Sequence, residues 1–255
     1  MNIIETPSHN FSERSGKITS LVLHYTGMKS CSEAVSRMQD KAAEVSAHYC
    51  IDKNGDIYKL VDESKKAWHS GKSFWRGVEG LNDSSIGIEI ANNGHEFGYE
   101  LFPKAQIKSV TKLCQDIIAK YKIDFRNVIG HSDIAPERKE DPGEFFPWQY
   151  LAECGVGFFH GINYQQDFHY RQPFFSPNEE SKEIGELQRK LAIIGYKIQK
   201  TTILDEQTIK VITAFYRRFL PERISLSKNA RYPENIKWDS LADVILNDIF
   251  IRYNF

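Results

Sequence analysis

The chain of 255 residues has no run of apolar residues long enough for a membrane-spanning helix, which needs roughly 18 or more in succession. We therefore expect no transmembrane segment. The first ten residues also lack the basic and apolar segments of a signal peptide. This absence favours a cytoplasmic protein. The periplasm or cell envelope is the alternative, if the chain has been separated from a leader or is exported without a visible signal.

An excess of basic residues is also lacking. The 33 lysines and arginines are balanced by 34 aspartates and glutamates, for a net charge of −1. Nucleic-acid-binding domains usually carry a clear basic excess, so nucleic acid is not an expected partner. Apolar and charged contents are ordinary for a soluble globular protein.

Cysteine is scarce and forms no CxxC pair, since Cys31, Cys50, Cys114 and Cys154 are widely spaced. Four cysteines could form two disulfides. However, Cys114 falls on the apolar face of a predicted helix, and Cys50 lies within a strand-like run. We therefore favour buried free thiols, which fits a reducing compartment slightly better than an oxidising one.

The first 151 residues contain alternating strand and helix patterns. An Asn54-Gly55 turn between residues 47–51 and 57–61 predicts a β-hairpin. Apolar residues recur at helical spacing after Pro103, through about residue 122. Such alternation predicts an α/β or α+β domain with a mixed central sheet flanked by helices. Further strands are predicted at 18–26, at 85–90 and in the run that ends on His131, and a further helix at 33–43.

The rest of the chain has a different character. Residues 152–178 are rich in glycine, proline and aromatic residues without a clear period, which predicts a linker that packs on the first domain. Residues 179–255 then predict a small three-helix domain. Its first helix ends at Gly195, and Asp205 and Asp239 are expected to cap the second and third.

Two short apolar runs end on histidines, His24 and His131, and Lys139 and Asp141 follow the second within eleven residues. Strand ends and the loops after them are frequent positions for functional groups. Two imidazoles and a carboxylate are suitable zinc ligands, and a fourth position open to water is typical of catalytic zinc. A single histidine is more often structural than a ligand, so these residues alone leave both readings open.

Four segments, in the right order, resemble the zinc-dependent N-acetylmuramoyl-L-alanine amidases, and in particular the branch of peptidoglycan-recycling and outer-membrane amidases that is related to peptidoglycan recognition proteins. The resemblance spans roughly residues 18–150. The C-terminal pattern more weakly resembles a three-helix peptidoglycan-binding domain; a plain helical bundle is the alternative. The four segments are Leu23-His-Tyr-Thr26, Ala67-Trp-His-Ser-Gly71, Ser85-Ile-Gly-Ile-Glu-Ile90 and Gly130-His-Ser-Asp-Ile-Ala-Pro136 with Arg138-Lys-Glu-Asp-Pro-Gly143.

The resemblance implies one Zn²⁺ ion held by His24, His131 and Asp141, with water in the fourth position. It implies that Glu89 acts as general base and proton shuttle and that Lys139 stabilises the oxyanion. From the pattern alone, Glu89 could equally face solvent, and Lys139 could be an ordinary loop lysine. Three further residues are candidates for substrate binding, or for holding the loop that carries them: His69, His48 and Asn82.

The implied activity is hydrolysis of the amide bond between N-acetylmuramic acid, or its 1,6-anhydro form, and L-alanine of the peptidoglycan stem peptide. Peptidoglycan or muropeptide fragments would be its partners, and a monomer is expected. A non-catalytic peptidoglycan receptor and a zinc peptidase acting within the stem peptide are the alternatives. A receptor of this fold would typically lack part of the ligand set, which this chain retains.

Overall fold

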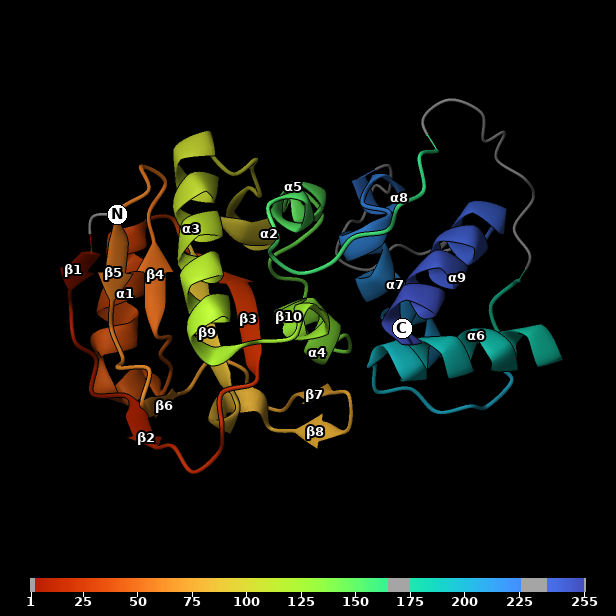
Figure 1. Ribbon diagram of the computed structural model, residues 1–255, viewed down its shortest axis with the longest axis horizontal. Helices are drawn as coiled ribbons and strands as arrows, with labels where there is room; N and C mark the ends of the chain where they lie inside the picture. Colours follow the sequence, from red (N-terminus) through yellow and green to blue (C-terminus); the bar gives the residue numbers. More distant parts are fainter. Residues whose placement is uncertain (1–2, 165–174, 226–237, 255) are drawn as a thin grey trace.

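The computed structural model describes residues 3–164, 175–225 and 238–254. Figure 1 shows a sheet with helices on both faces in the N-terminal part and a group of helices beside it in the C-terminal part. This arrangement confirms the predicted mixed α/β fold with an additional helical region. No helix in the described ranges is both long and apolar enough to cross a membrane.

The central sheet has six strands in the order β1-β5-β4-β9-β3-β10. All neighbouring strands are parallel except β4 and β5, which form the predicted antiparallel hairpin. Parallel neighbours place the carboxyl ends of β3, β9 and β10 at one edge of the sheet. The strands are β1 (Ile3–Glu5), β3 (Ser20–Tyr25), β4 (Tyr49–Ile51), β5 (Ile57–Lys59), β9 (Ser85–Ile90) and β10 (Val128–Gly130).

Helix α3 (Lys104–Tyr121) covers one face of the sheet. Its apolar stripe packs against side chains that alternate along the strands, because successive residues of a strand point to opposite faces. Leu21 and Leu23 of β3 belong to this face, so Val22 and His24 point to the other. Apolar side chains from α3 in this cluster are Ile107, Val110, Leu113, Cys114 and Ile117.

On the opposite face, α1 (Cys31–Gln39) packs beside β4, and Val22 of β3 and Ile129 of β10 belong to a hydrophobic cluster that extends into the C-terminal helices. Two small antiparallel sheets lie outside the main one: β2 (Phe11–Glu13) with β6 (Lys65–Ala67), and β7 (Phe74–Trp75) with β8 (Val78–Glu79). The four cysteines are free, as preferred from the sequence, and three of them are buried.

The predicted strand that ends on His131 differs from the structure. Strand β10 ends at Gly130, and His131 is the first residue of the short helix α4 (His131–Ile134). The side chain of Asp133 accepts a hydrogen bond from the backbone N–H of Gly130 at 2.8 Å, which favours the helical turn at this point. A further short helix, α5 (Trp148–Glu153), follows the loop that carries Asp141.

The described C-terminal residues form α6 (Lys182–Ile194), α7 (Glu206–Phe219), the short α8 (Glu222–Ser225) and α9 (Ser240–Asn254). Gly195 ends α6, and Asp205 accepts a hydrogen bond from the backbone of Thr208 at the start of α7, as predicted. Asp239 similarly accepts one from the backbone N–H of Ala242 at the start of α9.

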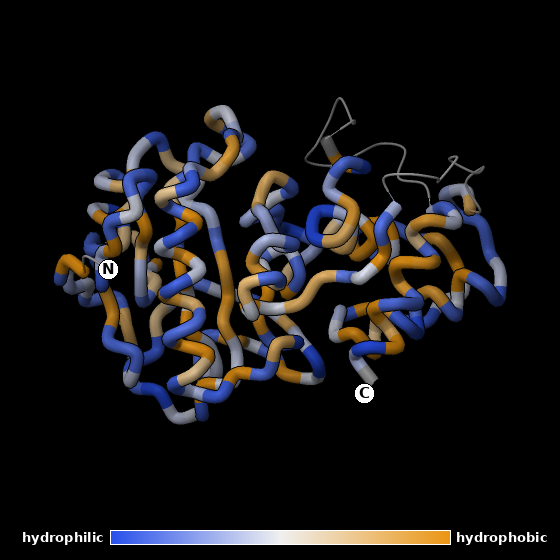
Figure 2. Tube along the Cα trace, turned by 45° about the horizontal axis from the view of Figure 1, so that its top comes forward, coloured by the Kyte–Doolittle hydropathy of each residue, from blue (hydrophilic) through white to orange (hydrophobic). Residues whose placement is uncertain are grey.

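One continuous hydrophobic cluster joins these helices to the sheet. It contains Val22 and Ile129 from the strands together with buried residues of α6, α7 and α9. Figure 2 shows apolar positions along the helices as well as along the central strands. The predicted boundary at residues 152–178 therefore does not interrupt the core, although part of that segment, 165–174, lies outside the described residues. Phe158 and Phe159 pack against the cluster.

Candidate metal centre

His24, His131 and Asp141 come from three separate elements that meet at the carboxyl edge of the sheet. His24 is the fifth residue of β3, and His131 opens α4 directly after the neighbouring strand β10. Asp141 lies on the loop after α4. The backbone N–H of Ser132 donates to the carbonyl of Asp141 at 2.8 Å, so the two ligand-bearing segments after β10 are fixed to each other.

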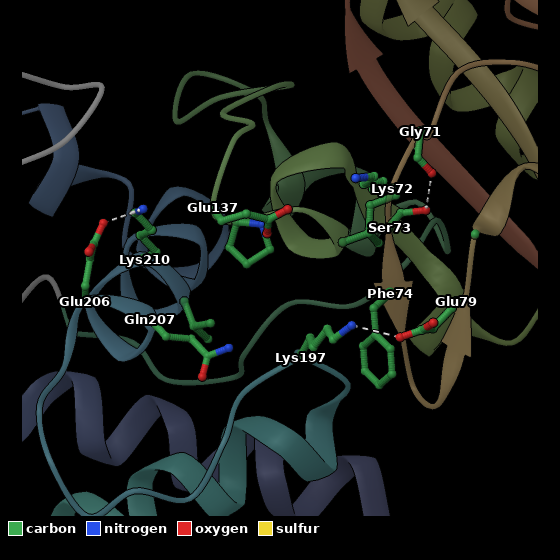
Figure 3. Close-up of a pocket in the computed structure, with 14 residues that line it drawn as sticks. Gly71, Lys72, Ser73, Phe74, Glu79, Glu137, Lys197, Glu206, Gln207 and Lys210 are labelled. Atoms are coloured by element: carbon green, nitrogen blue, oxygen red, sulfur yellow. Dashed lines mark hydrogen bonds and ion pairs between the residues drawn. The ribbon is translucent and has the colours of Figure 1, made fainter.

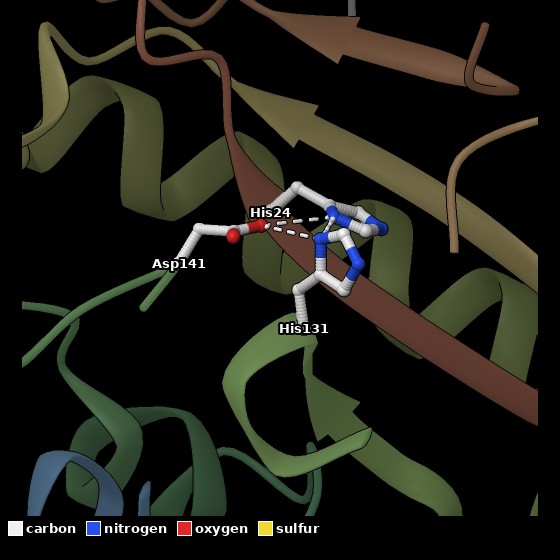
Figure 4. Close-up of side chains that lie close together, drawn as sticks. All are labelled: His24, His131 and Asp141. Carbon is white, nitrogen blue, oxygen red and sulfur yellow. Dashed lines mark hydrogen bonds and ion pairs between the residues drawn. The ribbon is translucent and has the colours of Figure 1, made fainter. Parts of the chain in front are cut away.

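The three side chains converge and are buried (Figure 4). The Nδ1 atoms of His24 and His131 lie 2.9 Å apart, and each lies 3.0 Å from Oδ2 of Asp141. These are the only three residues in the described part of the chain whose side chains could together hold a metal ion. The predicted ligand set is therefore brought together, although its role as a ligand set is our proposal.

The hydrogen bond at the other ring nitrogen determines the tautomer of His131. Nε2 lies 3.2 Å from the carbonyl oxygen of Ser70, which can only accept. Nη2 of Arg138, a donor, lies farther from this nitrogen, at 3.5 Å, so we assign the proton to Nε2 of His131; in the neutral ring Nδ1 is then left with a lone pair. That lone pair points toward His24 and Asp141.

A longer chain of hydrogen bonds leads to the same conclusion for His24. The hydroxyl of Ser85 donates to the carbonyl of Leu81 at 2.6 Å, so its oxygen can accept from Nε2 of His69 at 3.2 Å. Nδ1 of His69 is then an acceptor, and Nε2 of His24 donates to it at 3.0 Å. His24 therefore also presents a lone pair at Nδ1.

Two imidazole lone pairs and a carboxylate oxygen thus face one another with no donor among them. Burial lowers the pKa of His24 to about 4, and the neighbouring His131 adds to this effect, so His24 stays neutral near pH 7. Such a set of acceptors fits a divalent cation, and nitrogen and oxygen ligands of this kind fit zinc.

Glu89 lies beside this cluster because it pairs in register with His24 on the adjacent strand β9. Its Oε2 atom is inaccessible to solvent and has no hydrogen-bond partner among the described residues. Burial and the negative charge of Asp141 raise the pKa of Glu89 well above its ordinary value, while Lys139 lowers it in part. A carboxylate with a raised pKa and a free oxygen is a candidate for proton transfer.

Lys139 is partly exposed, and its charge acts on both His24 and Glu89. Its ammonium group has no ion pair or hydrogen bond in the described ranges, whereas Nη2 of its neighbour Arg138 donates to the backbone carbonyls of Ser70 and Lys72. Arg138 donates to the same Ser70 carbonyl that accepts from His131. No sequence pattern points to Ser70, because its contribution is a backbone oxygen.

The structure supports a loop-holding role for His69, His48 and Asn82, one of the two roles left open by the sequence. His69 lies behind His24, and His48 accepts from the backbone N–H of Gly87 at 3.0 Å. Oδ1 of Asn82 accepts from the backbone N–H groups of His69 and Ser70. All three are directed at protein groups, and a contact with substrate stays a prediction.

A separate cavity of about 900 Å³ lies between the β7–β8 hairpin and α7 (Figure 3). Lys197 and Glu79, which both line it, form an ion pair at 2.8 Å. Its charged lining is balanced, so its charge favours no particular class of ion. The charged lining residues are Lys72, Glu79, Glu137, Lys197, Glu206 and Lys210.

Comparison with known proteins places this geometry in a family. The family described as N-acetylmuramoyl-L-alanine amidase matches residues 14–144, just over half of the chain. This range contains the three proposed metal ligands, Glu89 and Lys139. The chain belongs to this family. The amidase AmiD of Escherichia coli is 37% identical over 217 residues, which are 80% of this chain and 76% of that protein.

Solved structures extend the likeness beyond the matched domain. A complex of the E. coli amidase AmiD superposes with a TM-score of 0.72 and 31% identity, covering 95% of this chain and 93% of that one. AmpDh3 from Pseudomonas aeruginosa gives a TM-score of 0.74 at 28% identity, with 94% of each chain covered. The C-terminal helices, which the family match leaves out, are therefore part of the arrangement shared with these amidases.

Proposed function

We propose that this amidase hydrolyses the bond between N-acetylmuramic acid and L-alanine of the peptidoglycan stem peptide with one zinc ion held by His24, His131 and Asp141. The reaction follows from the family. The observation that carries the metal assignment is the convergence of two imidazole lone pairs and a carboxylate oxygen without a donor between them. Two histidines and one carboxylate leave an open position, as catalytic zinc sites do.

Glu89 is the general base in this proposal. Zinc in such a site lowers the pKa of water toward about 7 and polarises the substrate carbonyl. The free oxygen of Glu89 accepts a proton from the attacking water and returns it to the nitrogen of L-alanine as the amide bond breaks. Its raised pKa suits the first step, because a carboxylate that binds a proton more tightly than usual is a better proton acceptor from water.

Lys139 stabilises the negative charge that develops on the carbonyl oxygen. Its ammonium group is not engaged by another described side chain, and its charge reaches both His24 and Glu89. A fixed cation near a developing oxyanion lowers the barrier most in a site with little water. Arg138 does not suit this role, because its guanidinium is committed to the loop at Ser70 and Lys72.

The anhydro form of the sugar is an expected substrate. The E. coli AmiD structure holds anhydro-N-acetylmuramic acid-L-Ala-D-γ-Glu-L-Lys, and an AmpDh3 structure holds an anhydromuramic pentapeptide. We propose that this chain cleaves such soluble fragments and also polymeric peptidoglycan. Binding of peptidoglycan by the C-terminal helices would raise the local substrate concentration by tethering.

The deciding experiment is digestion of intact sacculi and of soluble anhydro-muropeptide, with and without a chelator, read by mass spectrometry. Release of an intact peptide beginning with L-alanine from both substrates, abolished by the chelator and restored by zinc, is the expected result. Release from the soluble fragment alone would restrict the enzyme to recycling-type substrates. Cuts within the stem peptide would indicate a peptidase, and no cleavage by zinc-loaded protein would favour a receptor.

A further inference from the structure

The carboxylate of Asp133 joins the metal-binding turn to the C-terminal helices. Asp133 lies two residues after His131 on α4 and is almost completely buried. Besides the backbone N–H of Gly130, it accepts from the hydroxyl of Tyr196 at 2.8 Å and from Nη1 of Arg218 at 2.8 Å. Tyr196 follows α6, and Arg218 lies on α7, so both donors come from outside the family match.

Arg218 contacts the segment before His131 as well as the segment after it. Its Nη2 atom donates to the carbonyl of Val128, the first residue of β10, at 3.0 Å. Its guanidinium lies 4.4 Å from the ring centroid of Trp148 on α5. Both Arg218 and Asp133 are buried, and a guanidinium with two anchored ends fixes orientation more firmly than a point charge. The strand and turn on the two sides of His131 are thus held by one side chain.

The adjacent arginine contacts the other ligand-bearing segment. Nε of Arg217 lies 3.9 Å from Oε2 of Glu144, three residues after Asp141. The carboxylate of Glu144 also lies 3.1 Å from Nε2 of His95, whose Nδ1 lies 2.9 Å from the hydroxyl of Tyr25, next to His24. Arg217 and Arg218, which are consecutive on α7, therefore contact the segment that carries Asp141 and the segment that carries His131, respectively.

Other contacts also join the two parts of the molecule, among them the shared hydrophobic cluster and the ion pair of Lys197 with Glu79. Beyond the end of α4, the cavity of Figure 3 separates the loop at Glu137 from Lys210 on α7. Among these contacts, the buried donors on Asp133 lie at the turn that carries His131.

We propose that Arg218 and Tyr196 are positioning residues for the metal centre. By holding Asp133 and Val128 they fix the orientation of His131, so the C-terminal helices form part of the zinc site as well as of the fold. Groups that orient a ligand from behind typically change metal affinity or activity about 10- to 100-fold when they are lost. This inference rests on the proposed zinc function.

The test compares zinc affinity of the full-length chain and its variants at a temperature well below unfolding. Zinc is titrated against a chromophoric chelator, and kcat and KM are measured on anhydro-muropeptide. Arg218→Gln is expected to weaken zinc binding by about 10- to 100-fold and to lower kcat more than it raises KM. Arg189→Gln is the control, because Arg189 of α6 contacts Glu186 of the same helix and the ring of Phe250 on α9, both within the C-terminal helices.

Two further variants separate positioning from general stability. Tyr196→Phe removes only the hydroxyl donor and is expected to fold. If Arg218→Gln does not fold, the zinc affinity of Tyr196→Phe tests the positioning role. It should weaken zinc binding several-fold. Arg218→Lys keeps a cation beside Asp133 and should recover part of the affinity lost in Arg218→Gln.

Zinc affinities of folded Arg218→Gln and Tyr196→Phe within twofold of the wild type would overturn the proposal, even if both proteins unfold at lower temperature. Measurements on the wild type distinguish failure of the proposed zinc function from failure of the positioning role. If the wild type itself binds no zinc or cleaves no substrate, the proposed function is wrong. If it does both and these variants match it, only the positioning role is wrong.

Discussion

The imidazole of His69 lies directly against the backbone of Gly87. A Cβ atom at Gly87 would come within 2.4 Å of Cγ of His69, so a side chain at this position of β9 is incompatible with the observed place of His69. His69 accepts from Nε2 of His24. The absence of a side chain at residue 87 therefore determines the tautomer and orientation of a proposed zinc ligand on the neighbouring strand.

We expect Gly87→Ala to lower zinc affinity by about 10- to 100-fold, the usual effect of losing a group that orients a ligand. Chelator competition measures the affinity directly. The double variant Gly87→Ala with His69→Ala shows whether the effect acts through the imidazole. In the absence of the His69 ring, the added methyl group at residue 87 should change zinc affinity little further. Independent, additive effects in this cycle would contradict the interpretation.

Glu89→Gln should reduce kcat by about 10²- to 10⁴-fold, the usual contribution of a general base. Zinc content should be unchanged, because Glu89 is not in the proposed ligand set. Metal analysis alongside turnover on anhydro-muropeptide checks both points. A metal-free Glu89→Gln protein would show that the carboxylate acts on metal binding instead.

Lys139→Met should lower kcat by about 10²- to 10³-fold, as loss of an oxyanion-stabilising donor does, with a small change in KM. Arg138→Met is a useful comparison, because the neighbouring cation contacts the carbonyl of Ser70 and its loss should act on metal affinity. Equal effects of both variants on kcat and on zinc affinity would remove the distinction between their roles.

Zinc should stabilise the folded chain in proportion to its affinity, by about 2.7 kcal/mol at a free concentration 100 times the Kd. The midpoint of thermal unfolding should therefore rise on adding zinc and fall on adding a chelator. In His131→Ala the midpoint should no longer respond to zinc, because two ligands do not complete the site. A zinc response in that variant would place the ion elsewhere.

Stability should fall as the pH drops below about 6.5, in part because of His48. Burial lowers the pKa of His48 to about 4, although the Lys65 carbonyl that accepts from its Nε2 offsets part of the effect. Between the ordinary pKa of about 6.5 and 4, the unfolded chain binds a proton that the folded chain excludes. The contribution of His48 is therefore present above pH 6.5 and is lost toward pH 4.

His48→Asn should reduce this acid sensitivity. The asparagine oxygen can still accept from the backbone of Gly87, but the residue does not titrate. Denaturant unfolding of chelator-treated protein should show the free energy of unfolding falling by about 2 kcal/mol less between pH 7 and pH 5 than in the wild type. Exposed His9→Asn is the control. Identical pH slopes in wild type and His48→Asn would refute the assignment.

Local sequence was enough to predict several of the main elements and the proposed ligand set. The Asn54-Gly55 turn produced the hairpin of β4 and β5, and Asp205 caps α7 as expected. The segments around His24, His131 and Asp141 were sufficient to identify a family. Such signals depend on residues close together in the chain, where turn and capping chemistry act.

The tertiary structure decided how the ligands are oriented. Ser70 contributes a carbonyl, Gly87 contributes the absence of a side chain, and Arg218 acts across 85 residues on Asp133. None of these contributions has a local sequence pattern, because each depends on which segments the fold brings together. The sequence by itself therefore determined the chemistry that this chain can carry. The packing of distant segments determined which atoms hold the proposed ligands in place. It also brought the C-terminal helices into contact with the turn that carries His131.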